Sequence, residues 1–210
     1  MANAAYKAAR GMCRDFGEVE HLQVSRKGPA DFVSSADHKA EETLVEDLRR
    51  ARPKFGFLLE EGGEIAGEDS SNRWIIDPLD GTTNFLHGIP HFAISIGLER
   101  DRKMFAGVIY DPLRDELFWA ESGSGAFVNS TRLRVSARPR LDEALIATGI
   151  PFKGRASHPE YSEMLDRMSA ETIGVRRFGS AALDLAYVAA GRLELSLIHI
   201  SEPTRPRLLS

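Results

Sequence analysis

A short apolar strand that runs directly into two aspartates constrains this chain more than any other feature. The residues from Trp74 to Phe85 read WIIDPLDGTTNF, so an apolar run is followed by Asp77, Asp80 and a Gly-Thr-Thr segment. Carboxylates end a buried strand at a high cost unless a cation meets them there. The pattern predicts a strand from Trp74 to Ile76, with both aspartates in the loop that follows it.

The residue types in this loop favour phosphate chemistry. Asp77 and Asp80 can share one hard cation or hold two side by side, because Mg²⁺ prefers oxygen ligands. Gly81 lets the backbone approach a phosphate, whose oxygens the N–H groups of Gly81 and Thr82 could bind, and the Thr82 hydroxyl could position a water. Asp-Pro and Asp-Gly pairs also form ordinary turns, but the full nine-residue string DPLDGTTNF is more specific than that. A two-metal phosphoryl-transfer loop is therefore expected.

A second strand is expected to end in acidic residues. The segment FGFLLE, from Phe55 to Glu60, is apolar and is followed by Glu61 and two glycines. A Glu pair by itself is more often solvated surface than a site. Because strands that end in acids can converge at one edge of a sheet, we expect Glu60 to lie near the aspartates.

Periodic apolar residues and turn residues divide the chain into helices and short strands. Spacings of three and four predict helices at 6–16, 36–50, 161–168 and 181–190. Ser34 and Ser35 can cap the second helix, and the polar residues 26–31 before it are expected to form a loop. Short apolar runs predict strands at 55–60, 74–76, 92–98, 105–110, 116–120, 125–128 and 132–135. This order predicts a layered α+β fold around a largely antiparallel sheet.

Composition excludes several classes of function. The 210 residues carry 27 basic and 31 acidic side chains, a net charge of -4, with no basic excess for nucleic acid or a membrane surface. The lone Cys13 excludes an internal disulfide and a cysteine metal cluster, which fits a reducing compartment. No apolar run approaches the roughly 18 residues of a membrane span, and the N-terminus lacks a secretory signal. We expect a cytoplasmic protein that acts on small molecules.

Four segments of the chain resemble the inositol monophosphatase family, whose members are Mg²⁺-dependent, lithium-sensitive phosphatases. The segment DPLDGTTNF is similar to the family's first signature, and LEEGG resembles its Glu-Glu strand end. The resemblance continues through HFAISIGLERDRKMFAGVIYDPLRDELFWAESGSGAFVN and GSAALDLAYVAAGRLE, and so covers most of residues 6–194. It implies the layered α/β sandwich of the inositol monophosphatase and sugar phosphatase type, a homodimer, and closest kinship with the bacterial inositol-1-monophosphatases.

The resemblance also implies a set of metal ligands. Glu60, Asp77 and the backbone carbonyl of Leu79 would bind one Mg²⁺. Asp77 and Asp80 would bind a second Mg²⁺. Glu61 would support this set rather than belong to it.

Catalytic and substrate-binding roles follow from the same resemblance. Thr82, supported by Asp37, would polarise the attacking water, with Glu60 as the third catalytic residue. Gly81 and Thr82 would hold the phosphate, and Glu60, Leu79 and Asp80 would also contact the substrate. The hydroxylated ring would lie against Gly179, Ser180 and Ala181.

The C-terminal segment departs from the family. The family's second signature, a Trp-Asp pair followed by small residues, is absent, so the second Mg²⁺ would keep only Asp77, Asp80 and water. In its place stands LSLIHISEPTR, from Leu195 to Arg205, which resembles the translation of a sequencing-library adapter. A natural strand is the alternative. We expect a catalytic domain over 1–194, a non-native tail over 195–210, low stability, and weak or no activity.

Several functions remain open within this interpretation. The expected substrate is myo-inositol 1-phosphate or a related sugar phosphate. Histidinol phosphate, fructose 1,6-bisphosphate and 3′-phosphoadenosine phosphate are alternatives within the same class of phosphatase. A non-catalytic binding role associated with the transcription machinery is an alternative of a different class.

Overall fold

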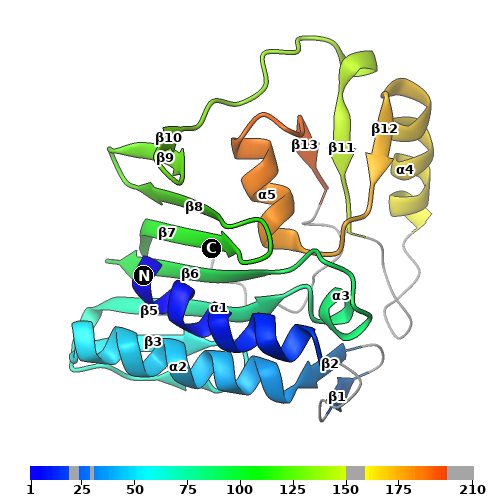
Figure 1. Cartoon of the computed structure of the whole chain (residues 1–210). Coiled ribbons are helices and arrows are strands. Elements are labelled where there is room, and N and C mark those ends of the chain that lie inside the picture. Colours follow the sequence, from blue (N-terminus) through cyan, green and yellow to red (C-terminus); the bar gives the residue numbers. More distant parts are fainter. Residues whose placement is uncertain (19–23, 29–30, 150–158, 198–210) are drawn as a thin grey trace. The chain divides into compact units, whose positions relative to one another are not determined.

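The computed structural model describes residues 1–18, 24–28, 31–149 and 159–197. The chain divides into two compact units, Met1–Leu133 and Arg134–Ser210, each with a sheet of its own (Figure 1). Residues 133–140 between these sheets have no regular secondary structure. The catalytic domain predicted over 1–194 includes the first unit and part of the second, and it stays a prediction.

Two packed helices form one layer of the first unit. They are α1 (Ala2–Phe16) and α2 (Ser35–Ala51), which agree with the predicted helices except that α1 begins earlier. Small side chains on their facing sides allow a close approach, and Lys7 forms an ion pair with Asp47 at 2.6 Å. The buried residues of this layer include Ala4, Ala5, Ala8, Ala9, Met12, Ala36, Ala40, Leu44 and Leu48.

The other layer of this unit is an eight-stranded sheet. Its strands, in spatial order, are β10 (Thr131–Arg132), β9 (Gly125–Val128), β8 (Glu116–Glu121), β7 (Lys103–Asp111), β6 (Ala93–Arg100), β5 (Asp69–Asp80), β3 (Phe55–Leu59) and β4 (Gly63–Ile65). Neighbouring strands are antiparallel except β3 and β5, which are parallel. The largely antiparallel sheet predicted from the sequence is confirmed, and α1 and α2 lie along one of its faces (Figure 1).

The aspartates of the first signature lie within β5, not in a loop after it. The sequence predicts a strand only over 74–76, but β5 runs from Asp69 to Asp80. Its pairing with β6 shifts register between Asp77, opposite Ser95, and Asp80, opposite Ala93. Three steps along β5 therefore oppose two along β6, which is the geometry of a bulge. The loop prediction is wrong because the strand continues through this bulge.

A short hairpin replaces the loop predicted at 26–31. The strands β1 (Val24–Gly28) and β2 (Asp31–Ser34) pair antiparallel and lead directly into α2. Pairing of backbone groups between the two strands satisfies their N–H and C=O groups without apolar alternation in the sequence. This is why a pattern of polar residues gave no strand signal.

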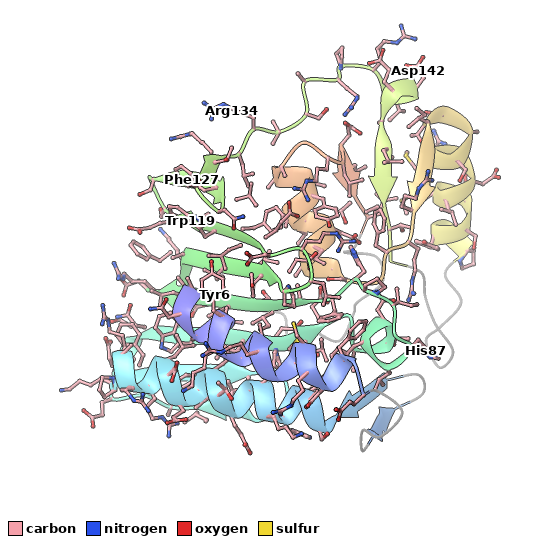
Figure 2. All side chains as sticks on the ribbon, viewed as in Figure 1. Tyr6, His87, Trp119, Phe127, Arg134 and Asp142 are labelled. Atoms are coloured by element: carbon pink, nitrogen blue, oxygen red, sulfur yellow. The ribbon has the colours of Figure 1, made fainter. Side chains whose placement is uncertain are left out.

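Aromatic contacts join α1 to the sheet and also link the neighbouring strands β8 and β9. Phe16 of α1 packs against Phe92, with ring centroids 5.1 Å apart, and Tyr6 meets Tyr110 edge-on at 4.8 Å. Towards the edge strands, Trp119 and Phe127 stack at 4.4 Å, and Figure 2 shows them on β8 and β9. Phe92 and Tyr110 belong to the core cluster of the first unit, and Phe16 and Trp119 pack against it.

The second unit has a small parallel sheet. Its strands follow the order β12 (Gly174–Arg176), β11 (Leu145–Ala147) and β13 (Leu195–Ser196), with the one-turn helix η2 (Leu141–Glu143) before β11. The helices α4 (Pro159–Glu171) and α5 (Ala181–Ala189) provide the connections that parallel strands require, and both are confirmed predictions. The strands β11 and β12 were not predicted, because runs of three residues carry no period. A strand at Leu195 is, from the sequence, only the alternative to a non-native tail.

Two predictions concern the ends of this region. The predicted strand at 132–135 is wrong beyond Arg132, because β10 ends there. Leu195 and Ser196 form β13, but residues 198–210 lie outside the described residues, so the origin of the tail stays a prediction. None of the described helices is long and apolar enough to cross a membrane.

Candidate active site

The two acidic strand ends lie side by side. Leu59 of β3 is in register with Ile76 of the parallel strand β5, and the N–H of Glu60 donates to the Ile76 carbonyl at 3.1 Å. Glu60, the residue after β3, therefore lies beside Asp77, which is still inside β5. The predicted convergence of the two acid-bearing strands is therefore present in the structure.

The bulge of β5 folds a carboxylate, a carbonyl and a hydroxyl close together. Asp77 Oδ1 accepts a hydrogen bond from the Leu79 N–H at 3.1 Å. The Thr82 hydroxyl lies 3.0 Å from the Leu79 carbonyl oxygen and 3.2 Å from Asp37 Oδ1. Thr82 and Asp37 are 45 residues apart in sequence, so tertiary structure alone brings them together.

Asp37 is held by its place on α2. It lies in the first turn of that helix, and only 1% of its surface is exposed. The helix dipole stabilises a carboxylate at this end, which offsets part of the cost of burying it. The hydrogen bond with Thr82 provides a further polar partner for the buried carboxylate.

Gly81 occupies a position that other residues fit poorly. Its φ is 100°, and a Cβ there would lie 3.1 Å from the His91 carbonyl oxygen and 3.3 Å from Phe92. The short helix α3 (Thr82–Leu86) begins immediately after it, where the sequence predicts only a loop. The N–H groups of Gly81 and Thr82 thus lie at the start of α3, and their role in holding phosphate stays a prediction.

A hydrogen bond from the Asn84 side chain holds the segment that follows α3. Its side-chain amide donates to the His91 carbonyl oxygen at 2.7 Å, and both residues are buried. Burial, and then the charge of Arg114, lower the pKa of His91, so its ring is neutral near pH 7. Asn84 was not singled out from the sequence, although it lies within the signature itself.

Glu41 is a second residue that the sequence analysis missed. It lies four residues after Asp37 on α2, and its Oε2 accepts a hydrogen bond from the Glu61 N–H at 3.0 Å. Burial raises the pKa of the Glu41 carboxyl, and hydrogen bonds from the Glu61 and Gly62 N–H groups oppose that rise. An acid on the buried face of a helix, one turn from a candidate catalytic residue, was the signal that could have found it.

The residues predicted to contact the substrate ring lie together at the start of α5, in the second unit. Gly179 has a φ of 89° and leads into Ser180, the buried N-cap residue, whose side chain accepts from the Leu183 N–H at 3.4 Å. Ala181 is the first residue of the helix. Local capping therefore accounts for their conformation, and their role with substrate stays a prediction.

The oxygen atoms at the strand ends fit Mg²⁺ in chemistry but are not gathered into a full ligand group. Over residues 1–18, 24–28, 31–149 and 159–197, no group of three or more His, Cys, Asp or Glu side chains is placed to hold a metal ion. Mg²⁺ is commonly held by only one or two carboxylates with several waters. Glu60 and Asp77 lie on neighbouring strands, and their role as Mg²⁺ ligands, with Asp80 and the Leu79 carbonyl, stays a prediction.

The model of the inositol monophosphatase family matches residues 1–203. The chain belongs to the inositol monophosphatase family. The matched range runs past Leu195 into the segment predicted to be non-native, whose origin remains a prediction.

Individual relatives give the same result. The inositol-1-monophosphatase of Rhizobium meliloti strain 1021 is 58% identical over 194 residues, which are 92% of this chain and 73% of that protein. The Nus factor SuhB of Escherichia coli K12 is 42% identical over 191 residues, 91% of this chain and 72% of the relative. The crystal structure of the extragenic suppressor protein suhB from Bartonella henselae superposes with a TM-score of 0.89 at 62% identity, covering 92% of this chain and 74% of that one. These structural relatives confirm the predicted α+β fold.

Proposed function

We propose that this chain is a Mg²⁺-dependent phosphomonoesterase that hydrolyses myo-inositol 1-phosphate, or a related sugar phosphate, to the alcohol and inorganic phosphate. The observation that carries the proposal is the Thr82 hydroxyl, held between the Asp37 carboxylate and the Leu79 carbonyl. This hydroxyl lies on the segment that follows Asp77, whose strand β5 is in register with β3, the strand that ends just before Glu60. The kinship with proteins named inositol-1-monophosphatase supports the choice of substrate.

In the proposed reaction, Thr82 and Asp37 orient the attacking water. When the Thr82 hydroxyl donates its hydrogen to Asp37, its lone pairs are free to accept a hydrogen from water, which aims the water oxygen at phosphorus. The bond from phosphorus to the inositol oxygen breaks as the new P–O bond forms. The attacking water gives up a proton and the leaving oxygen takes one, so one water is consumed for each alcohol and phosphate released. No covalent intermediate with the enzyme is needed.

The remaining site residues hold the phosphate and the ion. Glu60, Asp77, Asp80 and the Leu79 carbonyl would bind Mg²⁺, which supplies charge neutralisation of the phosphate and a lowered pKa of bound water. The N–H groups of Gly81 and Thr82 would donate to phosphate oxygens. Gly179, Ser180 and Ala181 would contact the ring hydroxyls, and a homodimer in the cytoplasm is part of the same proposal, supported by the family resemblance.

A comparison of substrates tests this function. We expect weak but Mg²⁺-dependent phosphate release from myo-inositol 1-phosphate, with the highest kcat/KM of the set and with inhibition by Li⁺. The other substrates of the set are histidinol phosphate, fructose 1,6-bisphosphate and 3′-phosphoadenosine phosphate. A higher kcat/KM on one of these would assign a related phosphatase. No release from any of the four, by this chain or by one whose C-terminus has been restored from the source DNA, would contradict the proposal.

A second candidate is a binding role without catalysis. It is favoured by the 42% identity to the protein named Nus factor SuhB. The net charge of -4 argues against direct binding of RNA by the chain alone, because such binding depends on clustered basic side chains. A gel-shift titration with RNA at several salt concentrations distinguishes the two functions. We expect no shift, and a salt-dependent shift would favour the binding role.

A further inference from the structure

Two buried carboxylates on one face of α2 reach the two loops that carry the candidate site. Asp37 and Glu41 are four residues apart, and 1% and 7% of their surfaces are exposed. Residues with this spacing lie one above the other on a helix. Asp37 reaches the Thr82 hydroxyl after β5, and Glu41 reaches the turn after β3. The sequence assigned a role to Asp37 but none to Glu41.

The Glu41 carboxylate lies closely against the turn that follows Glu60. Its Oε2 accepts from the Glu61 N–H at 3.0 Å, and the Gly62 N–H also stabilises its charged form. A Cβ on Gly62 would lie 3.1 Å from Glu41 Oε1, a contact tighter than most Cβ atoms make. Because residue 62 is a glycine, the Glu41 carboxylate can lie close to the backbone of this turn.

We propose that Glu41 is a positioning residue for the predicted metal ligand Glu60. The backbone of Glu60 is fixed on one side by its own N–H bond to the Ile76 carbonyl, 3.1 Å long, and on the other by the Glu41 bond to Glu61. A ligand whose backbone is fixed at both flanks loses less conformational freedom when its carboxylate takes up an ion. Asp37 would thus position the water-orienting hydroxyl of Thr82, and Glu41 would position the metal ligand Glu60. This inference rests on the proposed function.

Direct measurement of metal binding tests this role without substrate. Mn²⁺, which also prefers oxygen ligands and is visible by electron paramagnetic resonance, is the probe. Glu41→Gln is expected to weaken Mn²⁺ binding by about tenfold, the usual effect of losing a group that orients a metal ligand. Glu42→Gln removes the same charge from the next residue of α2, which is exposed, and is expected to leave binding unchanged. Equal Mn²⁺ affinity in Glu41→Gln and Glu42→Gln would overturn the inference.

Amide hydrogen exchange separates this inference from the function on which it rests. In Glu41→Gln the Glu61 and Gly62 amides are expected to exchange faster, whereas those of Thr82 and Asn84 keep their wild-type rates. Unchanged exchange at Glu61 and Gly62 would overturn the inference whatever the activity. Failure of the wild-type chain to bind Mn²⁺ or to release phosphate would instead overturn the proposed function.

A second variant keeps the test open if Glu41→Gln does not fold. Gly62→Ala leaves Glu41 in place but directs a methyl group at its carboxylate and at Leu59 Cδ1, 2.9 Å away. The same loss of Mn²⁺ affinity is expected, with the phosphate release rate restored at saturating Mg²⁺. A Gly62→Ala chain with wild-type Mn²⁺ affinity and wild-type amide exchange would contradict the positioning role.

Discussion

The two regions that carry candidate site residues are held in different ways. After β3 and β5, the site depends on hydrogen bonds between residues far apart in sequence, such as Glu61 with Glu41 and Thr82 with Asp37. At the start of α5, Ser180 caps its own helix through the N–H of Leu183, three residues on. The first region therefore needs the packed helix and sheet layers to exist, whereas the second is largely determined by local sequence. Substitutions of the polar side chains in the first should act mainly on chemistry, and removal of the helix cap in the second should act mainly on stability.

The largest effect is expected from Asp77→Asn. This change removes half of the negative charge of the Glu60–Asp77 pair while keeping an oxygen that can accept from the Leu79 N–H. Losing several kcal/mol of electrostatic stabilisation corresponds to a fall of about 1000-fold in phosphate release. The rate is measured at saturating substrate, and Mn²⁺ binding is measured on the same samples. Asp101→Asn, an exposed turn position with positive φ, is the control and should keep both properties.

Thr82→Ala should have the next largest effect. This change removes the hydroxyl that would link the attacking water to Asp37, and kcat is expected to fall about 100-fold with KM little changed. Thr82→Ser should recover most of the rate. The neighbouring Thr83 is exposed, so Thr83→Ala is expected to behave as wild type. Equal kcat values for Thr82→Ala and Thr83→Ala would show that Thr82 does not orient the water.

Much of this first region could be predicted from the sequence. The strand from 74 to 76, the helix that presents Asp37 and the convergence of Glu60 with Asp77 follow from apolar period, turn residues and the order of strands. The bulge that keeps Asp77 and Asp80 inside β5 could not be predicted, because it depends on register with β6. Glu41 was missed because a glutamate on a helix reads as solvated surface until the opposing Glu61 N–H is known. In the second unit, strands of two or three residues lie below the length at which a period can be recognised.

A comparison of two glycines measures how tightly the first region is packed. Gly81→Ala is expected to lower the free energy of unfolding by about 2 to 3 kcal/mol, because its φ of 100° and its contacts with His91 and Phe92 both oppose a side chain. Gly88 also has a positive φ, 66°, but a Cβ there would meet nothing within 4 Å. Gly88→Ala should therefore cost only about 1 kcal/mol. Urea unfolding of both variants gives the difference, and equal costs would show that Gly81 is not closely packed.

The smallest effect is expected in the second region. Ser180→Ala removes the N-cap of α5 and should lower the free energy of unfolding by about 1 kcal/mol. Ser169→Ala, on the exposed face of α4 in the same unit, removes a serine that bonds back to the Leu165 carbonyl and should be nearly neutral. Both are measured by urea unfolding. A fall in kcat as large as that of Thr82→Ala, with unchanged stability, would contradict a mainly local role for Ser180.

The metal dependence of a single turnover tests the central claim most directly. The wild-type 210-residue chain, in excess over myo-inositol 1-phosphate, is mixed with substrate either with Mg²⁺ or after removal of divalent ions by a chelator, and inorganic phosphate is followed in time. We expect phosphate release with Mg²⁺, none after chelation, and recovery when Mg²⁺ is returned. Release that chelation leaves unchanged would contradict a metal-dependent hydrolysis at Glu60, Asp77 and Asp80. No release at any Mg²⁺ concentration, from either this chain or one whose C-terminus has been restored, would contradict it as well.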